Sequence, residues 1–204
     1  MVAMDEQDRM TRAKALTCSG CPNVHTHPRV VRGEGDVNAR VMLIGQGPGA
    51  VEEETGRPFV GPAGMLLDRV LAEASLPRER LWVTNLIKCR AVKEEKGQLV
   101  DRAPLAGEIK ACRPWLEGEL EILRPRIVVC LGTPAAHALI DKKLKLSEEH
   151  GRFQEGPQGV RLLATFHPAY VLRLRSVDAD AHERTRQALV DDLKKVTAAL
   201  QLME

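Results

Sequence analysis

The distribution of the five cysteines is the feature that most constrains how this chain folds. Cys18 and Cys21 form a CxxC pair near the N-terminus, whereas Cys89 and Cys112 stand far along the chain. Four thiolates with this spacing can meet at one metal centre only after folding. Cys130 lies inside an apolar run and is expected in the core. On spacing alone, the other four suit either tetrahedral zinc or an iron–sulfur cluster.

The composition is that of a globular protein with a substantial core: 204 residues, 44% hydrophobic and 28% charged. The N-terminus has no secretory signal pattern, and no apolar stretch is long enough to span a bilayer. We therefore expect a cytoplasmic protein with reduced thiols and no membrane partner. A net charge of +2 neither indicates nor excludes a nucleic-acid partner, and 3% aromatic residues argue against a long base-stacking platform.

Apolar runs alternate with Gly/Pro turns and amphipathic segments, which predicts an α/β fold. We expect one domain over residues 1–204, with three α/β/α layers and a central four-stranded, mainly parallel sheet. Residues 1–35 have no core of their own and are expected to form an arm tied on by the metal cluster. Strands are predicted at residues 40–44, 81–87, 127–131 and 160–166, with helices at residues 62–74, before Pro125, at 133–140 and at the C-terminus.

Three polar side chains each follow a predicted strand. Gln46 follows the first strand, Asn85 lies at the end of the second, and His167 follows the fourth. In parallel α/β sheets, ligands bind outside the carboxyl ends of the strands. The sequence therefore predicts that these side chains share one pocket.

Four short motifs occur in one order along the chain. They are GQGPG at 45–49, TGRPFVGPAG at 55–64, TNLIKCR at 84–90 and FHPAY at 166–170. Together with the four spaced cysteines, they resemble the family 4 uracil-DNA glycosylases, the iron–sulfur branch of that superfamily. The resemblance implies an enzyme that flips uracil out of DNA and hydrolyses its N-glycosidic bond, leaving an abasic site. We expect it to act on uracil-containing DNA as a monomer.

The resemblance also implies the identity of the metal centre. By position, Cys18, Cys21, Cys89 and Cys112 would hold a [4Fe-4S] cluster. Base excision requires no electron transfer, so we expect a structural role for the cluster.

The resemblance assigns substrate recognition to Phe59 and Asn85. Taken alone, Phe59 suits a core aromatic and Asn85 a turn cap. In the family pattern, Phe59 would stack on the flipped base and Asn85 would read its Watson–Crick edge. Uracil presents a carbonyl acceptor beside an N–H donor, and a side-chain amide complements both. Cytosine would leave the amide mismatched.

His167 resembles the catalytic histidine of the family, which donates a hydrogen bond to O2 of uracil as the base leaves as an anion. The segment after it resembles the loop that wedges into the duplex. There Leu172 would plug the gap, while Arg173 and Arg175 would contact phosphates.

The chain departs from the family at Gln46, where a glutamate is usual and is thought to position the attacking water. Glutamine cannot act as a general base, and Gly47 fills the neighbouring position that carries an aspartate in the best-known uracil glycosylases. Gln46 and Gly47 are still expected to contact the base. Among three nearby acids, Glu52 is the expected substitute carboxylate, although such a run is often a solvated face.

A second departure is the polar loop at 90–104. It resembles the longer loop of a related branch that becomes covalently trapped on uracil-DNA through a histidine. Asp101 aligns with that histidine, and the loop contains none. Asp101 could orient water, attack the sugar, or be a solvated loop residue.

Two other functions fit the same residues. A uracil-DNA-binding protein with weak turnover would follow from Gln46, and a glycosylase for hypoxanthine or xanthine would follow from departures around the pocket. Binding without base release distinguishes the first, and an assay with those bases distinguishes the second.

Overall fold

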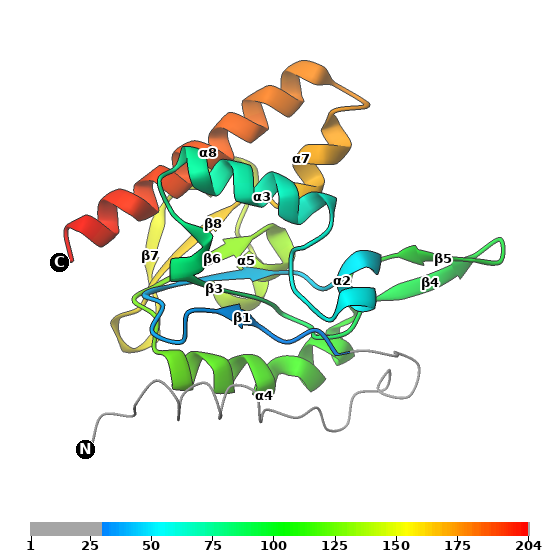
Figure 1. Ribbon diagram of the computed structural model, residues 1–204, viewed down its shortest axis with the longest axis horizontal. Coiled ribbons are helices and arrows are strands. Elements are labelled where there is room, and N and C mark those ends of the chain that lie inside the picture. Colours follow the sequence, from blue (N-terminus) through cyan, green and yellow to red (C-terminus); the bar gives the residue numbers. More distant parts are fainter. Residues whose placement is uncertain (1–29, 204) are drawn as a thin grey trace.

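The computed structural model describes residues 30–203. A twisted sheet lies between two layers of helices, and a hairpin extends to one side (Figure 1). Cys18 and Cys21 lie outside the described residues.

The central sheet has six strands in the order β1-β3-β2-β6-β8-β7. Its four inner strands are parallel, as predicted, while β1 and β7 pair antiparallel at the two edges. The expectation of four strands missed these edge strands because they are too short to show an apolar alternation. The strands are β1 (Glu34–Gly35), β2 (Val41–Gly45), β3 (Leu81–Asn85), β6 (Ile127–Leu131), β7 (Phe153–Glu155) and β8 (Arg161–Thr165).

Helices cover both faces of the sheet. In Figure 1, α3 and α8 lie above it and α4 lies below it. The helices are α2 (Ala50–Thr55), α3 (Pro62–Glu73), α4 (Ala106–Leu123), α5 (Thr133–Leu139), α6 (Leu146–Glu149), α7 (Pro168–Leu174) and α8 (Ala179–Gln201), with 3-10 turns η1 (Arg78–Arg80) and η2 (Pro157–Gly159).

Alternate residues of the inner strands serve two separate cores. In β2, Val41 and Leu43 pack with α3, α7 and α8, whereas Met42 and Ile44 pack with α4 and α5. Strands buried on both faces read as continuous apolar runs, which is why they are visible in the sequence. Cys130 belongs to the second core and is fully buried, as predicted, and burial raises the pKa of its thiol to about 12.

Residues 90–104 are not the irregular loop that was expected. They contain a two-stranded antiparallel hairpin, β4 (Val92–Glu95) and β5 (Gln98–Asp101), which extends from the body (Figure 1). Lys96 and Gly97 form its tip with φ of 52° and 77°, the left-handed pair that a tight hairpin turn requires. The exposed strands lack an apolar face, so their sequence reads as a loop.

The described part of the N-terminal arm is attached by its own contacts. Val31 is buried and its amide donates to the carbonyl oxygen of Lys88 (2.8 Å), while β1 pairs with β3. The sequence predicted that the arm is ordered chiefly through Cys18 and Cys21. Residues 30–35 are also held by the sheet itself. Along residues 30–203, no helix is long and apolar enough to cross a membrane.

The strand order indicates where on the sheet a ligand site would form. The chain runs from β2 to β3 on one side and then to β6 on the other, so the direction of winding reverses between β2 and β6. Crevices at such reversals lie at the carboxyl ends of the strands. Gln46, Asn85, Gly132 and His167 all lie at this edge.

Candidate active site

A cleft of about 920 Å³ opens at the carboxyl ends of the parallel strands. Its walls come from the loops after all four strands and from α2, α5, α6 and α7. This volume is much larger than that of one nucleobase such as uracil. The cleft therefore has room for a base together with part of the sugar–phosphate backbone of a nucleic acid. All the predicted base-contacting residues line it: Gln46, Gly47, Phe59, Asn85 and His167.

Phe59, Asn85 and His167 meet at the bottom of the cleft. Gly45 lies beneath the first two, because a Cβ atom there would clash with the Phe59 ring and the Asn85 side chain. The rings of Phe59 and His167 have centroids 5.8 Å apart and are inclined at 32°. One aromatic ring, one amide and one imidazole therefore surround the same small space.

Asn85 ends β3 and is 2% exposed. Its Oδ1 is buried without a hydrogen-bond partner among the described residues. An unsatisfied buried acceptor is costly and uncommon. This oxygen is therefore available to an N–H donor on a ligand.

His167 caps the N-terminus of α7 with its side chain. Its Nδ1 accepts a hydrogen bond from the Ala169 amide (3.1 Å), which leaves the proton of the neutral ring on Nε2. Burial, and then the charge of Arg173, lowers the pKa of His167 to about 4. The Nε2 atom is shielded from water and has no partner in the described part of the chain. At neutral pH, His167 therefore presents an uncharged, unused donor.

Gln46 and Gly47 form the loop that follows β2. The side chain of Gln46 lines the cleft and is partly exposed. A Cβ atom on Gly47 would lie 2.8 Å from Cγ1 of Ile87, so glycine lets this loop pack closely against the segment after β3.

Glu52 is buried, and both of its carboxylate oxygens bind backbone amides. Oε1 accepts from Val60 (3.1 Å) and Gly61 (2.8 Å), and Oε2 accepts from Gly49 (3.2 Å). These contacts join the loop after β2 to the segment that carries Phe59. The geometry favours a structural role over the expected handling of water.

Asp101 ends the hairpin at the rim of the cleft. Its side chain is 60% exposed and its Oδ1 lies 2.6 Å from Nε of Arg90, which also approaches Glu53. An exposed carboxylate paired with a guanidinium is a weak candidate for attack on the sugar.

The predicted duplex-contacting segment is helix α7 and the residues after it, not a loop. Leu172 is partly buried, packs against the core beneath α3 and α8, and lines the cleft. Arg173 and Arg175 are exposed, and Arg173 lies over the ring of Tyr170 (5.9 Å). Tyr170, at 42% exposure, presents more free apolar surface than Leu172.

Two of the four predicted metal ligands can be placed. Cys89 and Cys112 are both buried, and Cys112 packs with Ile87 and Ala91, which flank Cys89. The thiols thus come from neighbouring positions beside the cleft. Within residues 30–203 there is no group of three or more metal-binding side chains, and the other two predicted ligands fall outside that range.

Sequence reasoning missed a buried ionic network behind Asn85. Lys88, which has no exposed surface, donates from Nζ to Oε2 of Glu119 (2.7 Å), to Oγ1 of Thr84 (2.6 Å) and to the carbonyl oxygen of Asn85 (2.9 Å). A lysine directly after the predicted apolar strand at 81–87, between Ile87 and Cys89, was the available signal.

The sequence of the chain is similar to those of known proteins. A profile of the uracil DNA glycosylase superfamily matches residues 32–194. The chain belongs to this superfamily.

Named relatives within the superfamily are similar over most of the chain. A type-4 uracil-DNA glycosylase of Thermotoga maritima is 34% identical over 96% of this chain and 95% of its own length. One of Pyrobaculum aerophilum is 37% identical over 76% and 80%, respectively. A type-5 uracil-DNA glycosylase of Thermus thermophilus is 35% identical over 68% of each chain. The resemblance of the motifs to this superfamily is thus confirmed.

Proposed function

We propose that this protein removes uracil from DNA by hydrolysing its N-glycosidic bond, leaving free uracil and an abasic site. Membership of the uracil DNA glycosylase superfamily supports the reaction class. The observation that carries the proposal is the convergence of Phe59, Asn85 and His167, with two unused buried polar atoms, at the bottom of one cleft.

Recognition follows from the two polar atoms and the ring. Oδ1 of Asn85 would accept a hydrogen bond from N3–H of uracil, and the amide nitrogen would donate to the adjacent carbonyl. Cytosine has no proton on N3, so Oδ1 would stay buried and unpaired. Phe59 would stack on the face of the flipped base.

His167 would assist departure of the base. As the glycosidic bond breaks, negative charge develops on O2 of uracil, and a fixed donor aimed at that charge lowers the barrier. An uncharged Nε2–H donor suits this role, because its ring is held by the Ala169 amide and its neutral form persists to about pH 4.

None of the three candidate residues is well placed to activate the attacking water. Glu52 is occupied by three backbone amides and Asp101 is exposed and paired with Arg90. Gln46 could hold a water molecule by hydrogen bonds but could not take its proton. We therefore expect Gln46 to orient water and turnover to be slow.

Cys18, Cys21, Cys89 and Cys112 would hold the [4Fe-4S] cluster. The burial of Cys89 and Cys112, and their packing around one apolar patch, suit a closed structural centre. The cluster would cross-link the N-terminal segment to the segment after β3 and to α4. Iron, sulfide and zinc analysis of purified protein, with its visible absorbance, tests this assignment.

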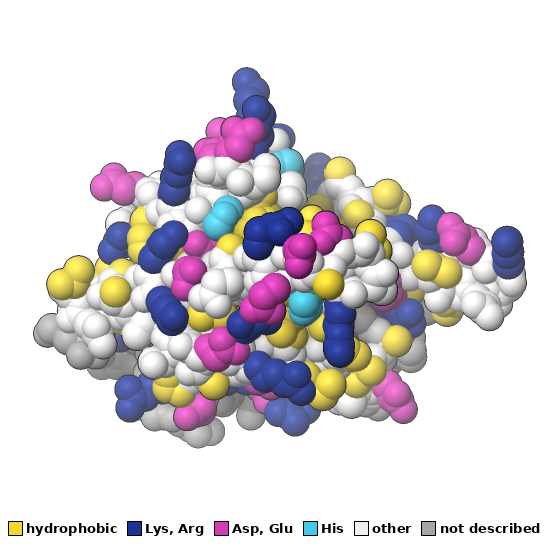
Figure 2. All heavy atoms as spheres, turned by 90° about the horizontal axis from the view of Figure 1, so that it is seen from above, with side chains coloured by type: hydrophobic (Ala, Val, Ile, Leu, Met, Phe, Trp, Pro, Cys, Tyr) yellow, Lys and Arg dark blue, Asp and Glu magenta, His cyan; other side chains and the backbone are white. Residues whose placement is uncertain are grey.

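Arg173 and Arg175 would contact phosphates, and Leu172 with Tyr170 would face the space that the flipped nucleotide leaves. On the face seen in Figure 2, basic and acidic side chains are interspersed. Such a surface supplies few phosphate contacts, so we expect DNA binding to depend on the region around the cleft. The proposal includes that the protein acts in the cytoplasm as a monomer. Gel filtration tests the oligomeric state.

The test is incubation of the purified protein with an oligonucleotide that contains one uracil, followed by alkali and a denaturing gel. Hydrolysis gives a cleaved strand and free uracil. Intact strands at all times of incubation contradict the proposal. Parallel oligonucleotides with hypoxanthine or xanthine test the alternative substrates.

A uracil-DNA-binding protein with weak turnover is the second candidate, favoured by Gln46 and the engaged Glu52. It predicts tight binding of uracil-DNA over matched cytosine-DNA with little free uracil. A shifted band that survives denaturation would instead indicate covalent trapping.

A further inference from the structure

The backbone of Phe59 adopts an unusual conformation. Its φ is 52°, in the left-handed region that bulky residues seldom enter, yet its ring is 5% exposed and lies at the bottom of the cleft. Strained residues persist only where their surroundings hold them, and they cluster at ligand sites. The contacts that hold Phe59 are therefore of functional interest.

Arg78, at the start of η1, holds the carbonyl side of this segment. Its Nη2 donates to the carbonyl oxygen of Pro58 (2.8 Å) and its Nη1 donates to that of Phe59 (3.1 Å). Asp68 on α3 orients the guanidinium through Nη1 (2.8 Å). A planar guanidinium binds two adjacent carbonyls in fixed directions, whereas an ammonium is a point charge on a flexible stem and fixes their geometry less well.

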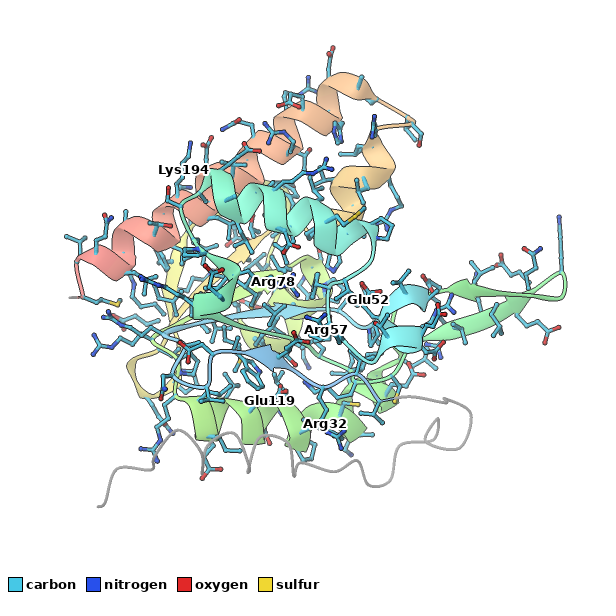
Figure 3. All side chains as sticks on the ribbon, in the orientation of Figure 1. Arg32, Glu52, Arg57, Arg78, Glu119 and Lys194 are labelled. Atoms are coloured by element: carbon cyan, nitrogen blue, oxygen red, sulfur yellow. The ribbon has the colours of Figure 1, made fainter. Side chains whose placement is uncertain are left out.

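Glu52 holds the amide side of the same segment. Its Oε1 accepts from the amides of Val60 and Gly61, immediately after Phe59. Glu52 on α2 and Arg78 at η1 reach the segment from different elements (Figure 3). The carbonyl oxygens of Pro58 and Phe59 are thus bound by a positive charge, and the amides of Val60 and Gly61 by a negative charge.

Gly64 completes the restraint from α3. A Cβ atom there would clash with the carbonyl group of Phe59, so the helix and the turn are in close contact. The segment cannot move toward α3, and movement away from it is opposed by the two carbonyl hydrogen bonds of Arg78.

We propose that Arg78 is a positioning residue that sets the stacking geometry of Phe59 on the flipped base. The inference rests on the proposed function, because it concerns the same base pocket. Arg78 does not line the cleft, and it acts only through the backbone of Pro58 and Phe59.

The experiment measures single-turnover uracil release by three single variants of the full-length protein with its metal centre. Arg78→Ala is expected to slow release about tenfold, the scale of one base–aromatic stacking contact. Arg78→Lys, which keeps the charge but loses the planar fork, should give an intermediate rate. Arg80→Ala is the matched control, because Arg80 lies on the same turn, is exposed, and should release uracil at the unmodified rate.

A double-mutant cycle separates positioning from general destabilisation. In a Phe59→Ala background, Arg78→Ala should slow release less than twofold further, since the ring that it positions is gone. If the decrease in rate caused by Arg78→Ala is the same with and without the Phe59 ring, the inference is overturned. If Arg78→Ala does not fold, the rate of uracil release by Arg78→Lys is used instead. A rate equal to that of the unmodified protein would overturn the inference.

The two proposals fail differently. If the unmodified protein releases no uracil, the proposed function is overturned and the inference with it. If it releases uracil, and Arg78→Ala matches Arg80→Ala, only the positioning role is overturned.

Discussion

The ammonium group of Lys88 lies 2.7 Å from Oε2 of Glu119, and neither side chain reaches water. Thr84 donates to the same carboxylate, and the Gly33 amide donates to its Oε1. Lys88 also donates to the carbonyl oxygen of Asn85. One buried ion pair therefore joins α4, the end of β3 and the described N-terminal segment.

Removing one partner of this pair should destabilise the fold strongly. Glu119→Gln leaves the charge of Lys88 buried and unpaired, and we expect the free energy of unfolding to fall by about 3–5 kcal/mol. Urea denaturation measures it. Glu117→Gln is the control, because Glu117 is exposed on the same helix and pairs with the exposed Arg113. Equal stability of the two variants would contradict the expectation.

Asn85→Ala should separate stability from activity. The substitution removes a buried oxygen that has no partner in the described structure, so the free energy of unfolding should not decrease. Uracil release should fall about 10²- to 10³-fold, since the polar contact that selects the base is lost. Denaturation and single-turnover assays are compared on the same preparation. A parallel loss of both properties would indicate a structural role for Asn85.

The pKa of His167 predicts the acid limit of activity. Protonation of Nδ1 would bring its hydrogen against the Ala169 N–H and release the ring from its fixed position. Because burial lowers this pKa to about 4, the rate of uracil release should stay level as the pH falls to about 5, and then decline with a midpoint near 4. A midpoint near the ordinary histidine value of about 6.5 would show that His167 is solvated.

The same pKa predicts how stability depends on pH. Between about pH 6.5 and 4 the unfolded chain binds a proton at His167 and the folded chain does not, so stability falls as the pH is lowered through this window. The full effect is on the order of 3 kcal/mol. His167→Asn keeps a capping side chain at α7 and should show a smaller decrease over this window. Denaturation of both proteins at several pH values checks the difference.

The inner architecture was predictable because buried parallel strands leave an unambiguous trace. The predicted strand at 127–131 coincides with β6, and the helix expected from Gly61-Pro62 is α3. Helix α7 was read as a turn and loop, although Pro168 favours a first helical turn. The hairpin has charged, exposed strands, and such a pattern does not distinguish a strand from a loop.

Two of the three side chains at the bottom of the cleft were predictable for a geometric reason. Asn85 ends a parallel strand and His167 follows another, and the carboxyl ends of such strands share one edge. Phe59 was predicted from the family resemblance alone. The partners of Glu52 and Arg78 were not predictable. Both side chains bind backbone groups of the Phe59 segment. Every residue has the same backbone groups, so such contacts leave no pattern in the sequence.

Gln46→Glu tests the water step. A carboxylate at this position could accept the proton of water, so we expect uracil release to rise about tenfold or more above the pKa of a glutamate, about 4.3. Gln46→Leu is the control for loss of any water contact. If Gln46→Glu gives no increase, another carboxylate, such as Asp101, already serves.

Gly45 ends β2 directly beneath Phe59 and Asn85, where no Cβ atom fits. The layer beneath these two side chains is therefore main chain, and main chain offers no atoms that substitution can trim. Engineering this enzyme toward bulkier damaged purines would have to widen the walls, because below Phe59 and Asn85 the depth of the cleft is not open to mutation.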